Sequence, residues 1–202
     1  MQNKTNAENS FAKVNSIMQI QRLGLPTPET VFIFDSEKQG AEIDIFLKNR
    51  ELVMIRSDKK DSAGKCPHNL KCPKHEAKEF IKKLNAEGFA AILQEHVPFN
   101  AFASGNVMLL KNKMIIELME GSPLTKLNRD GKLDEHIVLG RFNGRREIRH
   151  HGKRLLARNM LKKVLDLVEY LPFENRIVEF AVAPDWLFFW QIRDDKTSRM
   201  LE

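Results

Sequence analysis

The residues best suited to chemistry lie near the C-terminus, in two strand-like runs separated by Pro184-Asp185-Trp186. If these three residues form the turn of a hairpin, Glu179 pairs directly with Gln191, and Arg193 follows two residues further along the second strand. Directly paired residues share one face of a sheet, whereas a slip of one residue would separate them. We therefore expect the carboxylate, the carboxamide and the guanidinium to converge on one ligand.

Two cationic residues in the first third of the chain are suited to phosphate. Lys13 lies in a predicted helix over residues 8–23, nine residues before the Arg22-Leu-Gly-Leu-Pro-Thr-Pro28 turn. Arg56 ends a predicted strand over residues 52–56 and precedes Ser57. An ammonium group neutralises phosphate as a point donor, and a guanidinium offers paired planar donors. Either residue taken alone also fits a solvated helix lysine or an ordinary arginine at a strand end.

The middle of the chain carries polar residues on strand-like runs. Gln94 and Glu95 close a run over residues 90–96, and Glu117 lies in the second strand of a hairpin predicted over residues 102–119. Lys111-Asn112 joins the two strands of that hairpin. A core hairpin with polar ends is the alternative to a binding role.

These segments, in this order, resemble the nucleotide-binding domain of pyruvate phosphate dikinase and phosphoenolpyruvate synthase, an ATP-grasp domain. Ile55-Arg-Ser57 resembles the family's Val-Arg-Ser-Ser, and Ala91–Val97 resembles its Val-Val-Gln-x-Met-Val strand. Val178-Glu-Phe-Ala181 and Trp190-Gln-Ile-Arg193 resemble Ile-Glu-Trp-Ala and Leu-Gln-x-Arg-Pro, with Glu179 and Gln191 at the family's spacing of twelve. The resemblance covers nearly the whole chain.

The resemblance implies a role for each residue in a chain that binds Mg·ATP between two lobes. Lys13 and Arg56 would contact phosphates, Gln94 and Glu95 the adenine, and Glu117 the nucleotide. Glu179 and Gln191 would hold Mg²⁺, which prefers a few protein oxygen ligands beside water and phosphate. Arg193 would act with Arg56 as a catalytic residue by stabilising charge on the transferring group. The implied activity is that of a kinase-like phosphotransferase whose acceptor is a small molecule or a separate phospho-carrier protein.

Three departures from the family pattern leave a second function open. Asp58 replaces the second serine, with Ser62-Ala63-Gly64 as the remaining phosphate-loop candidate. Glu120-Gly121-Ser-Pro stands where the family has Gly-Leu-Gly-Glu, and Asp194 stands in place of a proline. The alternative is a non-catalytic, degenerate ATP-grasp module. Its basic run, residues 141–158, would bind nucleic acid or a protein partner through charge, with Phe142 as the one aromatic residue among Arg145, Arg146 and their neighbours.

Cysteine and histidine residues form a second candidate metal site in a predicted loop over residues 57–75. Zinc accepts such ligands in tetrahedral sets, although the spacing is not that of a standard finger. A reduced, exposed cysteine pair with incidental histidines is the alternative. The four residues concerned are Cys66, His68, Cys72 and His75.

The remaining patterns predict an α+β fold with two lobes, in which mostly antiparallel sheets are flanked by helices. We expect an N-terminal lobe over residues 1–88, with the phosphate-binding Lys and Arg, and a C-terminal lobe over 89–202, with the adenine strand and the metal-binding hairpin. Further elements are expected at residues 30–34, 37–49, 75–87, 137–141, 154–170, 176–182 and 187–192.

The bulk composition narrows the class of partner. The net charge of +6 favours an anionic partner. The absence of an apolar run of about 20 residues argues against a membrane span, so the sequence predicts a soluble cytoplasmic protein.

Overall fold

The computed structural model describes residues 11–60, 66–98, 100–121, 133–141, 147–172 and 174–194. It divides into two compact units. Unit 1 comprises residues 1–18 and 27–98, and unit 2 comprises residues 19–26 and 99–202.

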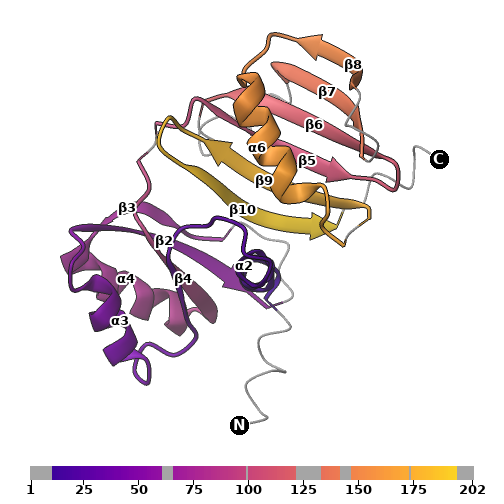
Figure 1. The fold of residues 1–202 in the computed structure, drawn as a ribbon. Helices are drawn as coiled ribbons and strands as arrows, with labels where there is room; N and C mark the ends of the chain where they lie inside the picture. Colours follow the sequence, from indigo (N-terminus) through magenta and orange to yellow (C-terminus); the bar gives the residue numbers. More distant parts are fainter. Residues whose placement is uncertain are drawn as a thin grey trace. The chain divides into compact units, whose positions relative to one another are not determined.

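Unit 1 is built on a four-stranded sheet whose strand pairs are all antiparallel, in the order β1-β4-β2-β3. The strands are β1 (Thr30–Ile33), β2 (Leu52–Lys59), β3 (Asn69–Pro73) and β4 (Phe89–Glu95). One face packs on α3 (Gly40–Leu47) and α4 (Lys74–Ala86), as Figure 1 shows. On the other face, Val14 and Ile17 of α2 (Ala12–Arg22) pack against Ala90 and Ile92 of β4.

Alternation along β4 explains why helices cover both faces of this sheet. Successive side chains of a strand point to opposite faces. Ala91 and Leu93 enter the core with α3 and α4, whereas Ala90 and Ile92 enter the core with α2. The strand is therefore apolar on both faces, apart from Gln94 and Glu95 at its end.

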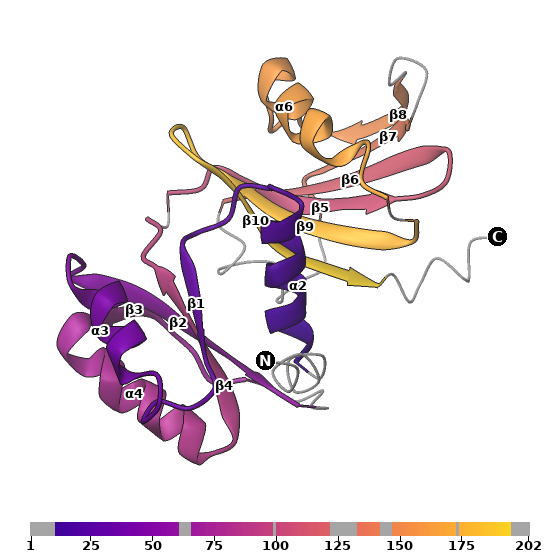
Figure 2. The same cartoon turned by 60° about the horizontal axis from the view of Figure 1, so that its bottom comes forward.

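Unit 2 contains a six-stranded antiparallel sheet in the order β10-β9-β5-β6-β7-β8. Its strands are β5 (Ala103–Leu109), β6 (Lys113–Glu120), β7 (Glu135–Gly140), β8 (Glu147–Gly152), β9 (Arg176–Val182) and β10 (Leu187–Asp194). The helix α6 (Arg158–Val168) lies against one face, which Figure 2 shows from the side. Val164, Leu165 and Val168 of α6 share a core there with Val107, Ile116 and Val178.

The α+β fold with antiparallel sheets and flanking helices is confirmed. The strand β4, which begins just after residue 88, pairs with β1 and β2 in unit 1. Two strands were not predicted: β3, in the expected loop 57–75, and β8, in the basic stretch. Among the residues described, no helix is long and apolar enough to cross a membrane.

Candidate functional site

The closing hairpin pairs Glu179 directly with Gln191, as the sequence predicts. The predicted three-residue turn is wrong, because Ala183 N donates to Trp186 O across a two-residue loop. A β-bulge between Phe189 and Gln191 then shifts the register by one residue. The bulge restores the predicted pairing and leaves Glu179, Gln191 and Arg193 on one face.

Two ion pairs hold this end of the hairpin. Arg193 Nε donates to Glu179 Oε1 at 2.8 Å, with side chains 46% and 29% exposed. Arg176 Nη1 lies 2.7 Å from Asp194 Oδ1, and the two residues are directly paired. Asp194 therefore links the two strands at their open end, although a pair this exposed adds little stability.

Glu179 belongs to a row of polar residues that are directly paired on neighbouring strands of the sheet. Asn106 lies directly opposite Glu179, Glu117 opposite Asn106, and His136 opposite Glu117. The apolar core with α6 takes the alternate residues of the same strands, such as Val107, Ile116 and Val178. The row therefore lies on the face opposite that core. Hereafter it is called the polar row, and its members are Gln191, Glu179, Asn106, Glu117, His136 and His151.

Two neighbouring residues of the polar row offer oxygen donors of the kind that a hard divalent cation accepts. Glu179 and Gln191 present a carboxylate and a carboxamide on directly paired positions. Oxygen ligands of this kind suit Mg²⁺. The residues present therefore fit the predicted metal.

In unit 1 the predicted phosphate contacts, Lys13 and Arg56, lie close together. Lys13 Nζ donates to the carbonyl oxygen of Ser57, the residue after Arg56, at 3.0 Å. Arg56 shares its sheet face with Ile92, its direct partner in β4, which packs on α2. Both cations therefore belong to unit 1, on the side of its sheet that carries α2, whereas Glu179 belongs to unit 2. Their contact with one common ligand stays a prediction.

Asp58 caps the start of α2. Its Oδ2 accepts from the backbone amides of Lys13 at 2.7 Å and Val14 at 3.1 Å. These amides belong to the first turn, where a helix lacks internal acceptors, and a carboxylate there also meets the positive end of the helix dipole. Asp58 therefore fixes the helix that carries Lys13. The Ser62-Ala63-Gly64 segment lies outside the described residues.

Replacement of Asp58 by alanine is expected to lower the free energy of unfolding by about 1–2 kcal/mol, the usual cost of a lost helix cap. Urea unfolding of the variant measures the effect. Asp44→Ala is the matched control, because Asp44 is exposed and forms only a surface ion pair with Lys78. Equal stability of Asp58→Ala and the parent protein would contradict the capping role.

Gln94 and Glu95, the predicted adenine contacts, point to opposite faces of the sheet because they are neighbours in β4. Gln94 is fully buried, and its Nε2 donates to Thr30 Oγ1 at 2.9 Å. Glu95 Oε1 accepts from the backbone amide of Glu29 at 3.0 Å. Only one of the two side chains can therefore face a given ligand on this sheet, and the adenine role stays a prediction.

The predicted zinc set does not assemble. Cys72 is buried in the core between β2 and α4, whereas His75 on α4 has an 82% exposed side chain. His68 Nδ1 contacts the carbonyl oxygen of Cys66 at 3.3 Å. In the described ranges, which include all four residues, no three His, Cys, Asp or Glu side chains could together hold a metal ion. The zinc prediction is wrong because β3, a strand that the sequence did not reveal, turns Cys72 inward.

The two cysteines are expected to differ in reactivity. Burial raises the pKa of the Cys72 thiol, and the nearby Glu76 carboxylate raises it further. Because the thiolate is the nucleophile, Cys72 should resist iodoacetamide at pH 7.5 in the native state and react once the protein is unfolded. Peptide mass spectrometry measures this, and rapid native labelling of Cys72 would contradict its burial.

The basic run begins with a residue that is structural. Arg141 is only 4% exposed, and it donates to the carbonyl oxygens of Glu169 at 3.0 Å, Leu110 at 3.1 Å and Leu171. These carbonyls lie just after α6 and at the end of the β5–β6 hairpin, so Arg141 ties the helix to the sheet. Phe142, Arg145 and Arg146 lie outside the described residues.

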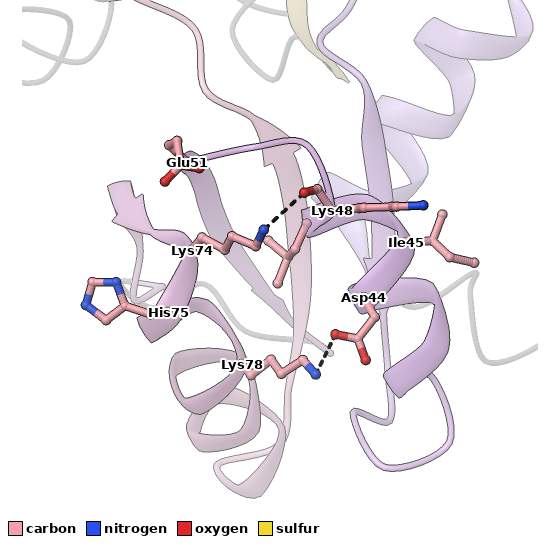
Figure 3. A pocket seen from close by; sticks show the side chains of 8 residues that line it. Asp44, Ile45, Lys48, Glu51, Lys74, His75 and Lys78 are labelled. Carbon is pink, nitrogen blue, oxygen red and sulfur yellow. Dashed lines mark hydrogen bonds and ion pairs between the residues drawn. The ribbon is translucent and has the colours of Figure 1, made fainter.

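A pocket of about 700 Å³ lies in unit 1, and none of the predicted nucleotide contacts lines it. Figure 3 shows its walls, where Lys78 pairs with Asp44, and Lys74 Nζ donates to the carbonyl oxygen of Lys48 at 3.0 Å. Of the predicted site residues only His75 lines it. The pocket therefore gives no support to the nucleotide site.

Comparison with known proteins identifies the fold. No protein-family model matches the sequence, and neither does any curated protein sequence. D-Alanine–D-alanine ligase from Helicobacter pylori superposes with a TM-score of 0.58 at 11% identity, over 94% of this chain and 55% of that one. The ADP complex of N5-carboxyaminoimidazole ribonucleotide synthetase gives 0.54 at 16% identity, over 93% and 45%. An ATP-grasp RimK domain protein from Sphaerobacter thermophilus gives 0.53 at 14% identity, over 96% and 62%.

The chain therefore has an ATP-grasp fold, as the sequence motifs predict. It spans about half the length of the solved structures that it matches. Identities this low establish the fold alone, and a fold hosts several chemistries. The activity must be argued from the site.

Proposed function

We propose that this chain binds Mg·ATP and transfers the γ-phosphoryl group to an acceptor. The observation that carries the proposal is the direct pairing of Glu179 with Gln191, with Arg193 on the same face, in an ATP-grasp fold. In the reaction an acceptor atom bonds to the γ-phosphorus, the bond to the β–γ bridging oxygen breaks, and ADP and a proton leave. Such a step requires positioning and charge neutralisation more than covalent help from the protein.

Each residue has a defined task in this proposal. Glu179 and Gln191 would hold Mg²⁺, which when bound neutralises phosphate charge. Lys13 and Arg56 would bind phosphate oxygens, and Gln94 and Glu95 remain candidates for the adenine contact. Arg193 would stabilise charge on the transferring group.

The ion pair between Arg193 and Glu179 also affects the proposed metal site. Arg193 Nε holds Glu179 Oε1 at 2.8 Å, on the carboxylate that would bind Mg²⁺. A metal-binding role for Glu179 would therefore compete with its ion pair to Arg193. Both side chains are partly exposed, so the exchange of one for the other costs little desolvation. In that case Arg193 would be available to bind phosphate oxygens beside Glu179.

The motifs favour a kinase-like phosphotransferase of the phosphoenolpyruvate synthase type, acting on a small molecule or a phospho-carrier protein. The solved neighbours include ligases and a synthetase, which supports nucleotide use and leaves the acceptor open. The second candidate is a non-catalytic ATP-grasp module that binds nucleic acid or a protein through its basic run. Burial of Arg141 removes one charge from that run.

The test is thermal unfolding with Mg·ATP, followed by an assay for ADP release. A ligand at 100 times its Kd stabilises the native state by about 2.7 kcal/mol, which raises the melting temperature measurably. The proposal predicts such a rise with Mg·ATP and ADP formation once an acceptor is supplied. Stabilisation without turnover for any acceptor would favour the non-catalytic module, and no stabilisation at millimolar Mg·ATP would refute both.

A further inference from the structure

The polar row continues beyond the proposed metal ligands. Asn106, Glu117 and His136 are direct neighbours on β5, β6 and β7. Direct neighbours on one face have Cβ atoms about 5 Å apart. The three side chains therefore form one group, hereafter the central polar group, with Asn106 next to Glu179.

Among the described residues, the acceptors of the central polar group have no hydrogen-bond partners. Oδ1 of Asn106 is buried there without a hydrogen bond, and all three residues are partly buried. In the part of the chain that the structure describes, neither the Glu117 carboxylate nor the His136 ring forms a hydrogen bond or an ion pair. A buried polar atom without a partner is destabilising. The unpaired Asn106 Oδ1, with the partly buried Glu117 and His136 beside it, therefore marks this part of the row as a candidate ligand site.

A neighbouring residue shows how this sheet satisfies a carboxylate that is purely structural. Glu135, next to His136 on β7, is 1% exposed and points to the opposite face. It accepts from Leu155 N at 2.8 Å and contacts His150 Nε2 at 3.0 Å. Among the described residues no comparable contact holds the Glu117 carboxylate, so it is available to a ligand.

The chemistry of the group selects a cation that donates hydrogen bonds. Asn106 Oδ1 and the Glu117 carboxylate are acceptors, His136 adds ring nitrogens, and Glu117 gives the group a negative charge. An anion would be repelled by Glu117. A transition metal is disfavoured, because the described residues contain no set of three His, Cys, Asp or Glu ligands.

We propose that Asn106, Glu117 and His136 bind a primary ammonium group of the phosphoryl acceptor. This assignment rests on the proposed function and names the class of acceptor. It gives Glu117 a role in binding the acceptor in place of the predicted role in binding the nucleotide. Glu117 lies two strands from Glu179, about 10 Å at the usual strand spacing. The ammonium group is thus an anchor rather than the reacting atom, separated from it by about the length of a small metabolite or a lysine side chain.

Methylammonium is the probe, because it presents the proposed group alone. Its two heavy atoms limit the expected Kd to roughly 10 mM or weaker. NMR titration should shift the His136 ring and Asn106 side-chain amide signals saturably. Tetramethylammonium carries the same charge without N–H donors and should leave both signals unchanged.

Glu117→Gln should weaken methylammonium binding about tenfold or more, because it removes the only negative charge of the group. Glu120→Gln is the matched control, since Glu120 is exposed on the same strand and outside the row. Equal shifts with both cations, or an unchanged affinity in Glu117→Gln, would overturn the assignment.

The same samples separate this proposal from the proposed function. Stabilisation by Mg·ATP without saturable methylammonium shifts refutes the ammonium site and leaves nucleotide binding intact. Methylammonium binding that Glu117→Gln weakens, in a protein that Mg·ATP does not stabilise, refutes the proposed function. The site would then bind ammonium in some other context, so the acceptor assignment would fall with it.

Discussion

Glu179→Gln is expected to weaken Mg²⁺-dependent binding of ATP by about 100-fold while the fold is retained. The carboxamide has the shape of the carboxylate but lacks its charge, and loss of a direct metal ligand should cost at least the 10–100-fold seen for supporting residues. The side chain is 29% exposed, so the free energy of unfolding should change by less than about 1 kcal/mol. Calorimetric titration with a non-hydrolysable ATP analogue, with and without Mg²⁺, measures the effect.

Asp185→Asn is the matched control for this variant. Asp185 lies exposed in the loop of the same hairpin, outside the polar row. Its replacement removes the same charge and should leave nucleotide binding unchanged. An equal loss in both variants would show that net charge, rather than a metal ligand, controls binding, and no loss in Glu179→Gln would contradict the metal assignment.

Arg141→Met is expected to lower the free energy of unfolding by about 3–5 kcal/mol, the largest stability effect that we predict. The variant leaves the carbonyl oxygens of Leu110, Glu169 and Leu171 without their donor in a buried position. Hydrogen bonds from a charged group contribute about 1.5–3 kcal/mol each, and the sum is reduced because the bonds are not additive. Urea unfolding followed by circular dichroism measures the loss.

Arg149→Met separates this effect from the general loss of a positive charge. Arg149 is exposed on β8 in the same basic run, so its replacement should change the free energy of unfolding by about 0.5 kcal/mol or less. A small effect in Arg141→Met would contradict the structural role and return Arg141 to the candidate binding surface.

The sequence predicted the helices and strands whose residues form apolar patterns. It did not predict the strands whose residues are mostly polar. Strand β9 was predicted at its observed limits, because Ile177, Val178 and Val182 form an apolar run. Strands β3 and β8 are the outer strands of their sheets, with the sequences NLKCP and EIRHHG. An edge strand with charged side chains gives no periodic signal. Missing β3 led directly to the wrong zinc prediction.

The candidate site was likewise predicted only in part from the sequence. The pairing of Glu179 with Gln191 was predicted correctly, although the predicted turn was one residue too long. A bulge near Trp190 compensates for the shorter loop and restores the pairing. No local signal in the sequence marks a bulge there. The central polar group was missed except for Glu117, because its members lie on three strands and become neighbours only through the sheet register. An alignment of the predicted strands in antiparallel register could have revealed it.

Paramagnetic NMR with Mn²⁺ in place of Mg²⁺ tests the central claim most directly. In the presence of a non-hydrolysable ATP analogue, Mn²⁺ bound at Glu179 and Gln191 should broaden the side-chain amide signals of Gln191 and Asn106 before any others. Asn106 reports on the site because it lies directly opposite Glu179. Sharp Gln191 and Asn106 signals in a sample that has bound the Mn²⁺–nucleotide complex would contradict the account, because the metal would then lie elsewhere on the protein.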